Sequence, residues 1–390
     1  MREWFNRQSW KDCVLERVPR VRIPFSPPMH KTFIIFVVAS LAWCLVLGVF
    51  VYMQIFAMAP LFNVPNISAS VILADNQPIV VSTTTSAPTP VTILAFGDMM
   101  LDRQVREKII QNGQEFPFVL IKDFLQGDGT PNDVVVANAE GPFTTRSSVT
   151  MGIKDGPLQF TFDSAMLSTL KNLGFTLLGQ ANNHALNFGL AGYSQSTTSI
   201  AAAGLNWFGD PRNIDVAPYV ADVRGEKIAF IGYHQFVNWG LNNVLQAIKE
   251  AKQSDSFVVV YPHWGVEYNL GFTPLQQKVA HELVDAGADV VFGAHPHVIE
   301  PIEMYKGKPI FYSLGNFIFD QASSGPTAQG LSVKVSLTPD QAKYDLFPIS
   351  ILNEQASPMS TGDEQTIFDR LNISNGQIIV PRQTQSVLLK

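Results

Sequence analysis

The protein has 390 residues, enough for two domains of average size or one large domain. Its formal net charge of -6 and aromatic fraction of 11% are ordinary for a globular protein, and nothing in them indicates a nucleic-acid partner. The charge is unevenly distributed, because residues 1–31 carry seven Lys and Arg against three acidic residues. This arm has a net charge of +4 and the rest of the chain -10, which makes a membrane the first hypothesis to examine.

The segment after the basic arm predicts a membrane span. No charged residue occurs between Thr32 and Ala74, and the core TFIIFVVASLAWCLVLGVFVYMQIFAM is long enough to cross a hydrocarbon layer of about 30 Å. We predict an uncleaved transmembrane anchor over residues 32–59. The alternatives are a buried helix or a cleaved signal peptide, which would have a shorter apolar stretch and a small-residue cleavage motif. Because basic residues beside a span tend to stay in the cytoplasm, the arm 1–31 is expected inside the cytoplasmic membrane and the main domain outside.

The body after the span is expected to begin with a linker and to continue as an α/β domain. Residues 60–90 include the Ser-, Thr- and Pro-rich stretch VSTTTSAPTPV, which lacks the periodicity of a packed face. The region 91–352 alternates apolar runs of strand length with helix-like stretches, which predicts sheets covered by helices. Residues 353–390 are polar and weakly patterned and are interpreted as a tail of uncertain order. The predicted strands are 91–96, 133–138, 175–182, 227–234, 256–263 and 289–295, and the predicted helices are 164–174 and 276–287.

Most of the unusual polar residues of this domain follow directly on predicted strands, where α/β sheets usually bind their ligands. Both cysteines, Cys13 and Cys44, precede the domain, so only His, carboxylate, amide and hydroxyl groups are available there for chemistry. A mixed nitrogen and oxygen donor set suits Mn, Fe or Zn better than it suits copper. The five elements are Gly97-Asp98, Asn138-Ala139-Glu140, Asn182-Asn183-His184, His263-Trp264-Gly265 and Gly293-Ala294-His295-Pro296-His297.

Each element alone has a structural explanation, such as a turn, a capped loop or a hydrogen-bonded core histidine. The pair His295 and His297 is more specific, because residues two apart on an extended segment project to the same side. Pro296 further favours an extended conformation at His295. Together, at five strand ends, the elements predict a metal site. His234 also ends a predicted strand, and we interpret it as a structural histidine.

Six motifs resemble the CapA family of poly-γ-glutamate capsule synthesis proteins, which is related to the calcineurin-like metallophosphoesterases. The resemblance extends over about residues 91–352. It implies a four-layer α/β/β/α metallophosphoesterase-like sandwich, preceded in this chain by the single N-terminal transmembrane helix. The motifs are FGDMMLDR (96–103), NAEGPFT (138–144), ANNHALNFG (181–189), HWGVEY (263–268), GAHPHVIEPIE (293–303) and YSLGNFIFD (312–320).

The resemblance implies a centre of one or two divalent ions, since the phosphoesterase relatives hold two metals about 3.5 Å apart. Asp98 and His297 would bind the first metal and Glu140 would bridge the pair, while the other three ligands would bind the second. The implied ligands are Asp98, Glu140, Asn183, His263, His295 and His297.

Other residues of the motifs have implied supporting roles. His184 would act as the general acid or contact a phosphate oxygen. Arg103, Asn138 and Glu267 would contact the substrate or support the ligands, and Asn316 is interpreted as structural support behind the site.

The chain departs from the related patterns at three positions. The phosphoesterase pattern has His two residues after the first Asp, where this chain has Met100, so the first metal lacks a ligand. The bridging carboxylate is Glu140 rather than Asp. Asn187 replaces the Asp that generally follows the NNH motif of the capsule family, which weakens the support of His184.

The function implied is a membrane-anchored, extracytoplasmic, metal-dependent hydrolase of capsule or poly-γ-glutamate synthesis or export. Its expected partners are the membrane, the capsule synthase components and an anionic polymer. One alternative is a scaffold without catalysis, which would hold the growing polymer for the synthase. Another is a general surface phosphodiesterase.

Overall fold

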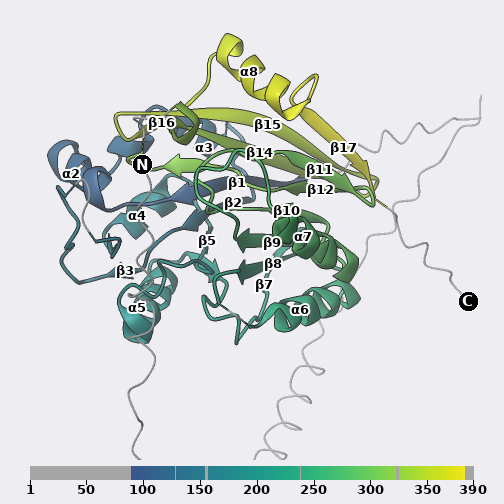
Figure 1. The fold of residues 1–390 in the computed structure, drawn as a ribbon, viewed down its shortest axis with the longest axis horizontal. Helices are drawn as coiled ribbons and strands as arrows, with labels where there is room; N and C mark the ends of the chain where they lie inside the picture. Colours follow the sequence, from purple (N-terminus) through teal and green to yellow (C-terminus); the bar gives the residue numbers. More distant parts are fainter. Residues whose placement is uncertain (1–88, 128, 154–156, 238, 322–324, 383–390) are drawn as a thin grey trace, which may run out of the picture. The chain divides into compact units, whose positions relative to one another are not determined.

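The computed structural model describes residues 89–127, 129–153, 157–237, 239–321 and 325–382 (Figure 1). The predicted arm 1–31, anchor 32–59 and almost all of the linker lie outside these residues. Within the described ranges, no helix combines the length and the apolar character that a membrane span needs. The N-terminal anchor and the orientation therefore stay predictions.

The larger sheet joins a parallel half to an antiparallel half at its central strand, β1 (Val91–Met99). Strand β13 pairs in parallel with the carboxyl end of β1. The other parallel strands are β2 (Val134–Ala139), β5 (Leu177–Gly179), β6 (Asn206–Phe208) and β13 (Asn316–Ile318). The antiparallel strands are β14 (Gln329–Leu337), β15 (Gln341–Leu352), β16 (Gln355–Pro358) and β17 (Gln377–Pro381).

The smaller sheet has a parallel centre with an antiparallel strand at each edge. Strand β9, with the sequence FVVVYPH, is buried along its whole length, as expected for a central parallel strand covered on both faces. In spatial order the strands are β11 (Ile302–Tyr305), β12 (Lys308–Phe311), β10 (Val290–Phe292), β9 (Phe257–His263), β8 (Glu226–His234) and β7 (Tyr219–Val223). Beside these sheets, β3 (Phe143–Thr144) and β4 (Phe162–Asp163) form a two-stranded ribbon.

The two sheets pack face to face and carry helices on their outer faces (Figure 1). On β1 successive side chains alternate, so Ile93 joins the cluster between the sheets while Leu94 joins the cluster under the outer helices. The larger sheet is covered by α2 (Arg103–Asn112), α3 (Lys122–Gln126) and α4 (Met166–Asn172). Helix α5 (Gly189–Ala202) packs against β3. Two short 3-10 helices, Phe116–Phe118 and Gly325–Ala328, lie in the loops. The smaller sheet is covered by α6 (Leu241–Gln253) and α7 (Pro274–Ala286).

This arrangement confirms the α/β domain with covered sheets. The predicted helix over 276–287 corresponds to α7, which begins at a capping box between Thr273 and Gln276 with Pro274 in its first turn. The predicted helix over 164–174 corresponds to α4. Every predicted strand overlaps a strand of one of the two sheets.

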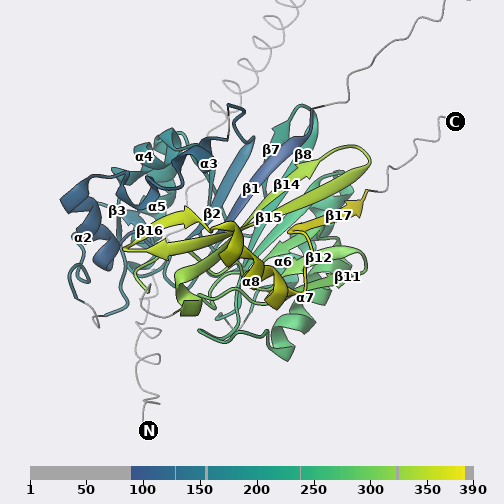
Figure 2. The same cartoon turned by 90° about the horizontal axis from the view of Figure 1, so that it is seen from above.

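The predicted tail from residue 353 is not supported by the structure over residues 355–382. Strands β16 and β17 both pair with β15, and the helix α8 (Thr361–Leu371) lies between them in the chain. Figures 1 and 2 show α8 lying across β15. Its residues Ile367, Phe368 and Leu371 belong to the same apolar cluster as the inner faces of the sheets. The apolar face of the larger sheet is buried by this helix, and the composition of residues 353–390 alone does not predict such a contact.

Candidate metal centre

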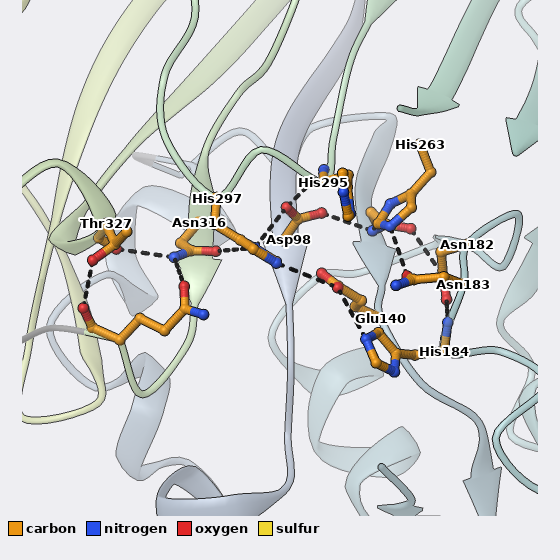
Figure 3. Close-up of polar contacts among 12 residues, drawn as sticks. Asp98, Glu140, Asn182, Asn183, His184, His263, His295, His297, Asn316 and Thr327 are labelled. Carbon is orange, nitrogen blue, oxygen red and sulfur yellow. Dashed lines mark hydrogen bonds and ion pairs between the residues drawn. The ribbon is translucent and has the colours of Figure 1, made fainter. Parts of the chain in front are cut away.

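The predicted site residues converge where the carboxyl ends of strands from both sheets meet (Figure 3). Asp98 is the next to last residue of β1, and Glu140 follows β2 directly. His263 is the last residue of β9, paired in register with His234 of β8. The loops after β5 and β10 bring the remaining predicted ligands to the same edge. The packing of the two sheets, whose parallel strands end at the same edge, therefore creates one polar cluster from five separate segments.

Asp98 lies at the centre of the cluster and is completely buried. Its Oδ1 accepts a 2.8 Å hydrogen bond from Nδ2 of Asn138, and its Oδ2 accepts a 3.0 Å bond from the backbone N–H of His295. Nδ1 of His297 lies 3.2 Å from the same Oδ2. Burial opposes ionisation, but these contacts, above all that with His297, hold the pKa of Asp98 below its usual value. Asp98 is therefore an ionised carboxylate in the interior.

Glu140 is also fully buried, but its carboxylate has no hydrogen-bond partner among the described residues. Its Oε1 lies 3.6 Å from Nε2 of His297 and 3.9 Å from Nε2 of His184. Burial and the negative charge of Asp98 raise the pKa of Glu140 well above its usual value. A buried carboxylate whose oxygens accept no hydrogen bond is costly unless a cation binds it, so this residue fits a metal ligand.

His297 links the two carboxylates, and Asn316 fixes its orientation. The Nδ2 atom of Asn316 donates to the backbone oxygen of Thr327, so its Oδ1 faces His297 and lies 3.0 Å from Nδ1. Nδ1 therefore carries a proton and Nε2 faces Glu140. Burial by itself lowers the pKa of His297, but Glu140 and Asp98 raise it to about 9. The expected support of the site by Asn316 is visible in this contact.

The second group of predicted ligands lies beside the first. The Oδ1 atom of Asn183 is 2.8 Å from Nε2 of His263, and the ring centroids of His263 and His295 are 4.8 Å apart. Nδ1 of His295 is buried without a hydrogen-bond partner in the described part of the chain. Burial lowers the pKa of His263 far below its usual value and that of His295 to about 3. Both rings are thus neutral, which is the form that binds metal.

The geometry of the His-Pro-His segment differs from the predicted one. His295 and His297 have φ angles of 96° and 57°, so neither is in an extended conformation, and Pro296 does not impose one. The positive φ values are unfavourable for non-glycine residues and are characteristic of functional sites. The two rings still converge, with centroids 5.9 Å apart, because the backbone N–H of His295 is hydrogen-bonded to Asp98.

His184 sits at the edge of the cluster against an aromatic ring. Oδ1 of Asn187 accepts a 2.7 Å bond from the backbone N–H of Phe160 and lies 3.1 Å from Nδ1 of His184. Because that backbone donor fixes the amide, Nδ1 of His184 carries the proton and Nε2 presents a lone pair towards Glu140. Burial lowers the pKa of His184 to about 4. In this form the ring can accept a proton or contact a donor. The role of His184 as general acid or as a contact to a phosphate oxygen stays a prediction.

The three weaker predictions have different positions. Asn138 contacts Asp98, and its Nδ2 also lies 3.3 Å from Nδ1 of His263, so it supports two predicted ligands. Arg103 forms a 2.8 Å ion pair with Asp320, and its contacts lie beside the centre rather than in it. Glu267 is exposed, and its carboxylate lies near ring nitrogens of His295 and His297.

The sequence assigned no role to two residues of the site. Asn182, named there only as part of the element Asn182-Asn183-His184, donates to Oδ1 of Asn138 at 3.0 Å. It accepts from the backbone N–H groups of His184 and Ala185, so it forms the turn that presents Asn183. Phe160 packs against His184 with ring centroids 4.3 Å apart, and no local sequence pattern marks that contact.

Among the described residues, two groups of three His, Asp or Glu side chains have ligand atoms within 4.8 Å of one another, and the groups share His297. One consists of Asp98, Glu140 and His297, and the other of Glu267, His295 and His297. Carboxylate and imidazole donors at this spacing suit borderline divalent ions.

Comparison with known proteins decides the family. Residues 92–321 match the model of the bacterial capsule synthesis protein family PGA_cap. The chain belongs to this family. It is 32% identical over 281 residues to the PGA biosynthesis protein CapA of Bacillus subtilis, covering 67% of this chain and 72% of that one. It is 29% identical over 302 residues to the capsule biosynthesis protein CapA of Bacillus anthracis, covering 72% of each chain. The resemblance seen in the motifs is thereby confirmed.

Solved structures show a more distant likeness. One such structure is a purple acid phosphatase from yellow lupin seeds, with 10% sequence identity and a TM-score of 0.35. The aligned region covers 77% of this chain and 55% of the phosphatase chain. A likeness at that level carries no argument about the chemistry of the site, which rests on the side chains described above.

Proposed function

We propose that this capsule-family protein is a membrane-anchored, extracytoplasmic hydrolase of poly-γ-glutamate or capsule synthesis or export that depends on divalent metal. The proposal rests mainly on one observation: the carboxylate of Glu140 is buried, and its oxygens have no hydrogen-bond partner among the described residues. It lies between His297 and His184, beside the ionised Asp98. In the described part of the chain, the oxygens of Glu140 and Nδ1 of His295 are buried without a hydrogen-bond partner, and a bound cation would satisfy them.

The residues that would hold the metal are the six predicted ligands. Bound there, divalent ions would supply Lewis-acid activation of water and would neutralise charge developing on a phosphoryl or carbonyl group. Asn138 and Asn316 orient the ligands, and the neutral His184 presents a lone pair towards the space beside Glu140. His184 can accept a proton from a substrate or from water in that space.

A specific observation favours the alternative of a scaffold without catalysis. Asn187 occupies the position at which capsule-family relatives generally carry Asp, and burial lowers the pKa of His184 to about 4. A histidine kept neutral in this way is a poor proton donor at neutral pH. In that case the metal would hold carboxylates of the polymer for the synthase components.

The test compares His184→Ala with His295→Ala in a host that lacks its own copy of the protein. If the protein is an enzyme, His184→Ala preserves metal content and abolishes surface polymer, because positioned proton transfer is typically worth about 10²–10⁴-fold in rate. His295→Ala removes both metal and polymer.

Normal polymer in His184→Ala with loss in His295→Ala would favour the scaffold. Unchanged metal content in His295→Ala would contradict the metal centre itself. Expression level and membrane recovery of each variant serve as the controls.

A further inference from the structure

Met100, two residues after Asp98, packs into the apolar core and not into the polar cluster. Met100 is fully buried and belongs to the apolar cluster under the outer helices. Its sulfur accepts a 3.1 Å hydrogen bond from the backbone N–H of Asp102. The thioether is thus used in packing and in the turn before α2, and cannot serve as a ligand beside Asp98.

A different side chain reaches the same centre from the solvent side. A carboxylate oxygen of Glu267 and ring nitrogens of His295 and His297 lie within 4.8 Å of one another. Ligands of one ion at about 2.0–2.2 Å lie at most roughly 4.4 Å apart, so a small movement of these groups is enough. Glu267 is exposed and can make that movement by rotating its side chain.

The loop that carries Glu267 is tied to the loop that carries both histidines. The backbone N–H of Tyr268 donates to the carbonyl oxygen of Pro296 at 2.8 Å, and the N–H of Trp264 donates to that of Ala294 at 3.1 Å. Tyr268 has a φ of 66°, an unfavourable angle for a bulky residue. Its hydroxyl accepts a 3.0 Å bond from Gln321. These contacts on both sides of Glu267 hold its backbone over the histidines.

The surroundings of Glu267 also leave room for a cation. Across the described ranges, no Lys or Arg forms an ion pair with Glu267. Its carboxylate lies near ring nitrogens of His295 and His297, which are metal-binding groups. No basic side chain of the described ranges therefore competes with a cation for Glu267.

We propose that Glu267 is a metal ligand, which together with His295 and His297 holds a divalent ion beside the carboxylates of Asp98 and Glu140. This assignment rests on the proposed metal centre and deepens it. An ion bound there would have the buried His295 and His297 on one side and the exposed carboxylate of Glu267 on the other. It would therefore exchange with solvent more readily than an ion bound by the buried groups alone.

The test is Mn²⁺ binding to the purified full-length protein, measured by calorimetric titration and by the electron paramagnetic resonance spectrum of the bound ion. Glu267→Gln keeps the size of the side chain and removes its charge. It should weaken the weaker Mn²⁺ site at least about 10-fold, with a changed spectrum, and leave the tighter site unchanged. Glu250→Gln, an exposed position on α6, is the matched control and should bind as the original chain does.

His295→Ala separates failure of this assignment from failure of the whole centre. Loss of Mn²⁺ in His295→Ala with unchanged binding in Glu267→Gln would overturn the assignment and leave the centre in place. Unchanged binding in both variants would overturn both. Loss of surface polymer in Glu267→Gln with Mn²⁺ binding intact would place Glu267 on the substrate instead, and would also overturn the assignment.

Discussion

Amide side chains decide which nitrogen of each histidine faces the centre. Asn316 and Asn187 each have their amide oxygen fixed by an unambiguous backbone contact, so the proton on Nδ1 of His297 and His184 is fixed as well. Asn138 instead holds Asp98 in place. Amides orient these groups without adding charge, which leaves the negative charge of the site available for a cation.

Glu300, three residues after His297, gives a prediction for the pH dependence of stability. Burial raises the pKa of Glu300 to about 7, although its hydrogen bond from Gln276 lowers it. Because the folded pKa exceeds the unfolded value of 4.5, the contribution of Glu300 to stability is present below pH 4.5 and is lost as pH rises through about 7.

Glu300→Gln should remove this loss. We expect the free energy of unfolding of the variant, relative to that of the original chain, to rise by about 2–3 kcal/mol between pH 5 and pH 8. Urea denaturation at the two pH values measures it. The same comparison for the exposed Glu250→Gln should give no trend, and a parallel shift at both pH values would contradict the explanation.

At the scale of elements, the carboxyl-terminal segment completes the sandwich. Ser360 caps α8 by accepting from the backbone N–H of Asp363, and Asn372 ends the helix in the left-handed conformation. The helix then covers the part of the larger sheet around β15 (Figure 2). This segment should therefore contribute to the cooperative unfolding of the domain.

Phe368 provides the test of that contribution. It is 7% exposed, and truncation to Ala leaves a cavity between α8 and the sheet. We expect Phe368→Ala to lower the free energy of unfolding by about 3 kcal/mol, measured by urea denaturation of the full chain. Ile379→Ala on β17 is the matched control, since that side chain is 52% exposed and should cost less than about 1 kcal/mol. A loss in Phe368→Ala as small as in the control would show that α8 is not part of the folded core.

At the scale of the whole molecule, the site depends on two sheets presenting their carboxyl ends at one edge. The larger sheet supplies Asp98, Glu140 and Asn183, and the smaller sheet supplies His263 and His295. Neither sheet holds a complete set of ligands. Loss of packing between the sheets should therefore abolish metal binding before it abolishes secondary structure.

The topology of the whole chain is a further prediction. The basic arm 1–31 and the uncharged stretch that follows predict that the domain lies outside the cytoplasmic membrane. Protease added to intact protoplasts should remove the body from about Asn63 onward and spare an N-terminal fragment of a few kilodaltons. A cytoplasmic protein serves as the control for intact cells. A body that is protected until the membrane is lysed would show the orientation to be wrong.

The sequence by itself determined the α/β class, the strands and the polar residues at their ends, because apolar runs of strand length and helical periodicity are local properties. It determined the family through motifs such as NNH and HPH. It did not predict the elements over residues 355–382, because these short elements are stabilised by contacts with the sheet that they cover. It also placed His295 in an extended conformation, although its backbone N–H is turned by Asp98, a partner 197 residues away.

Only the tertiary structure decided how the site residues meet. The direction of Met100 into the core, the orientation of His184 by Asn187 and the position of Glu267 over the histidines all depend on contacts between distant loops. Local sequence specifies which donors a strand end offers. The packing of the two sheets specifies which of them share one ion, because distances of a few ångströms between separate strands arise only when the faces between them are buried.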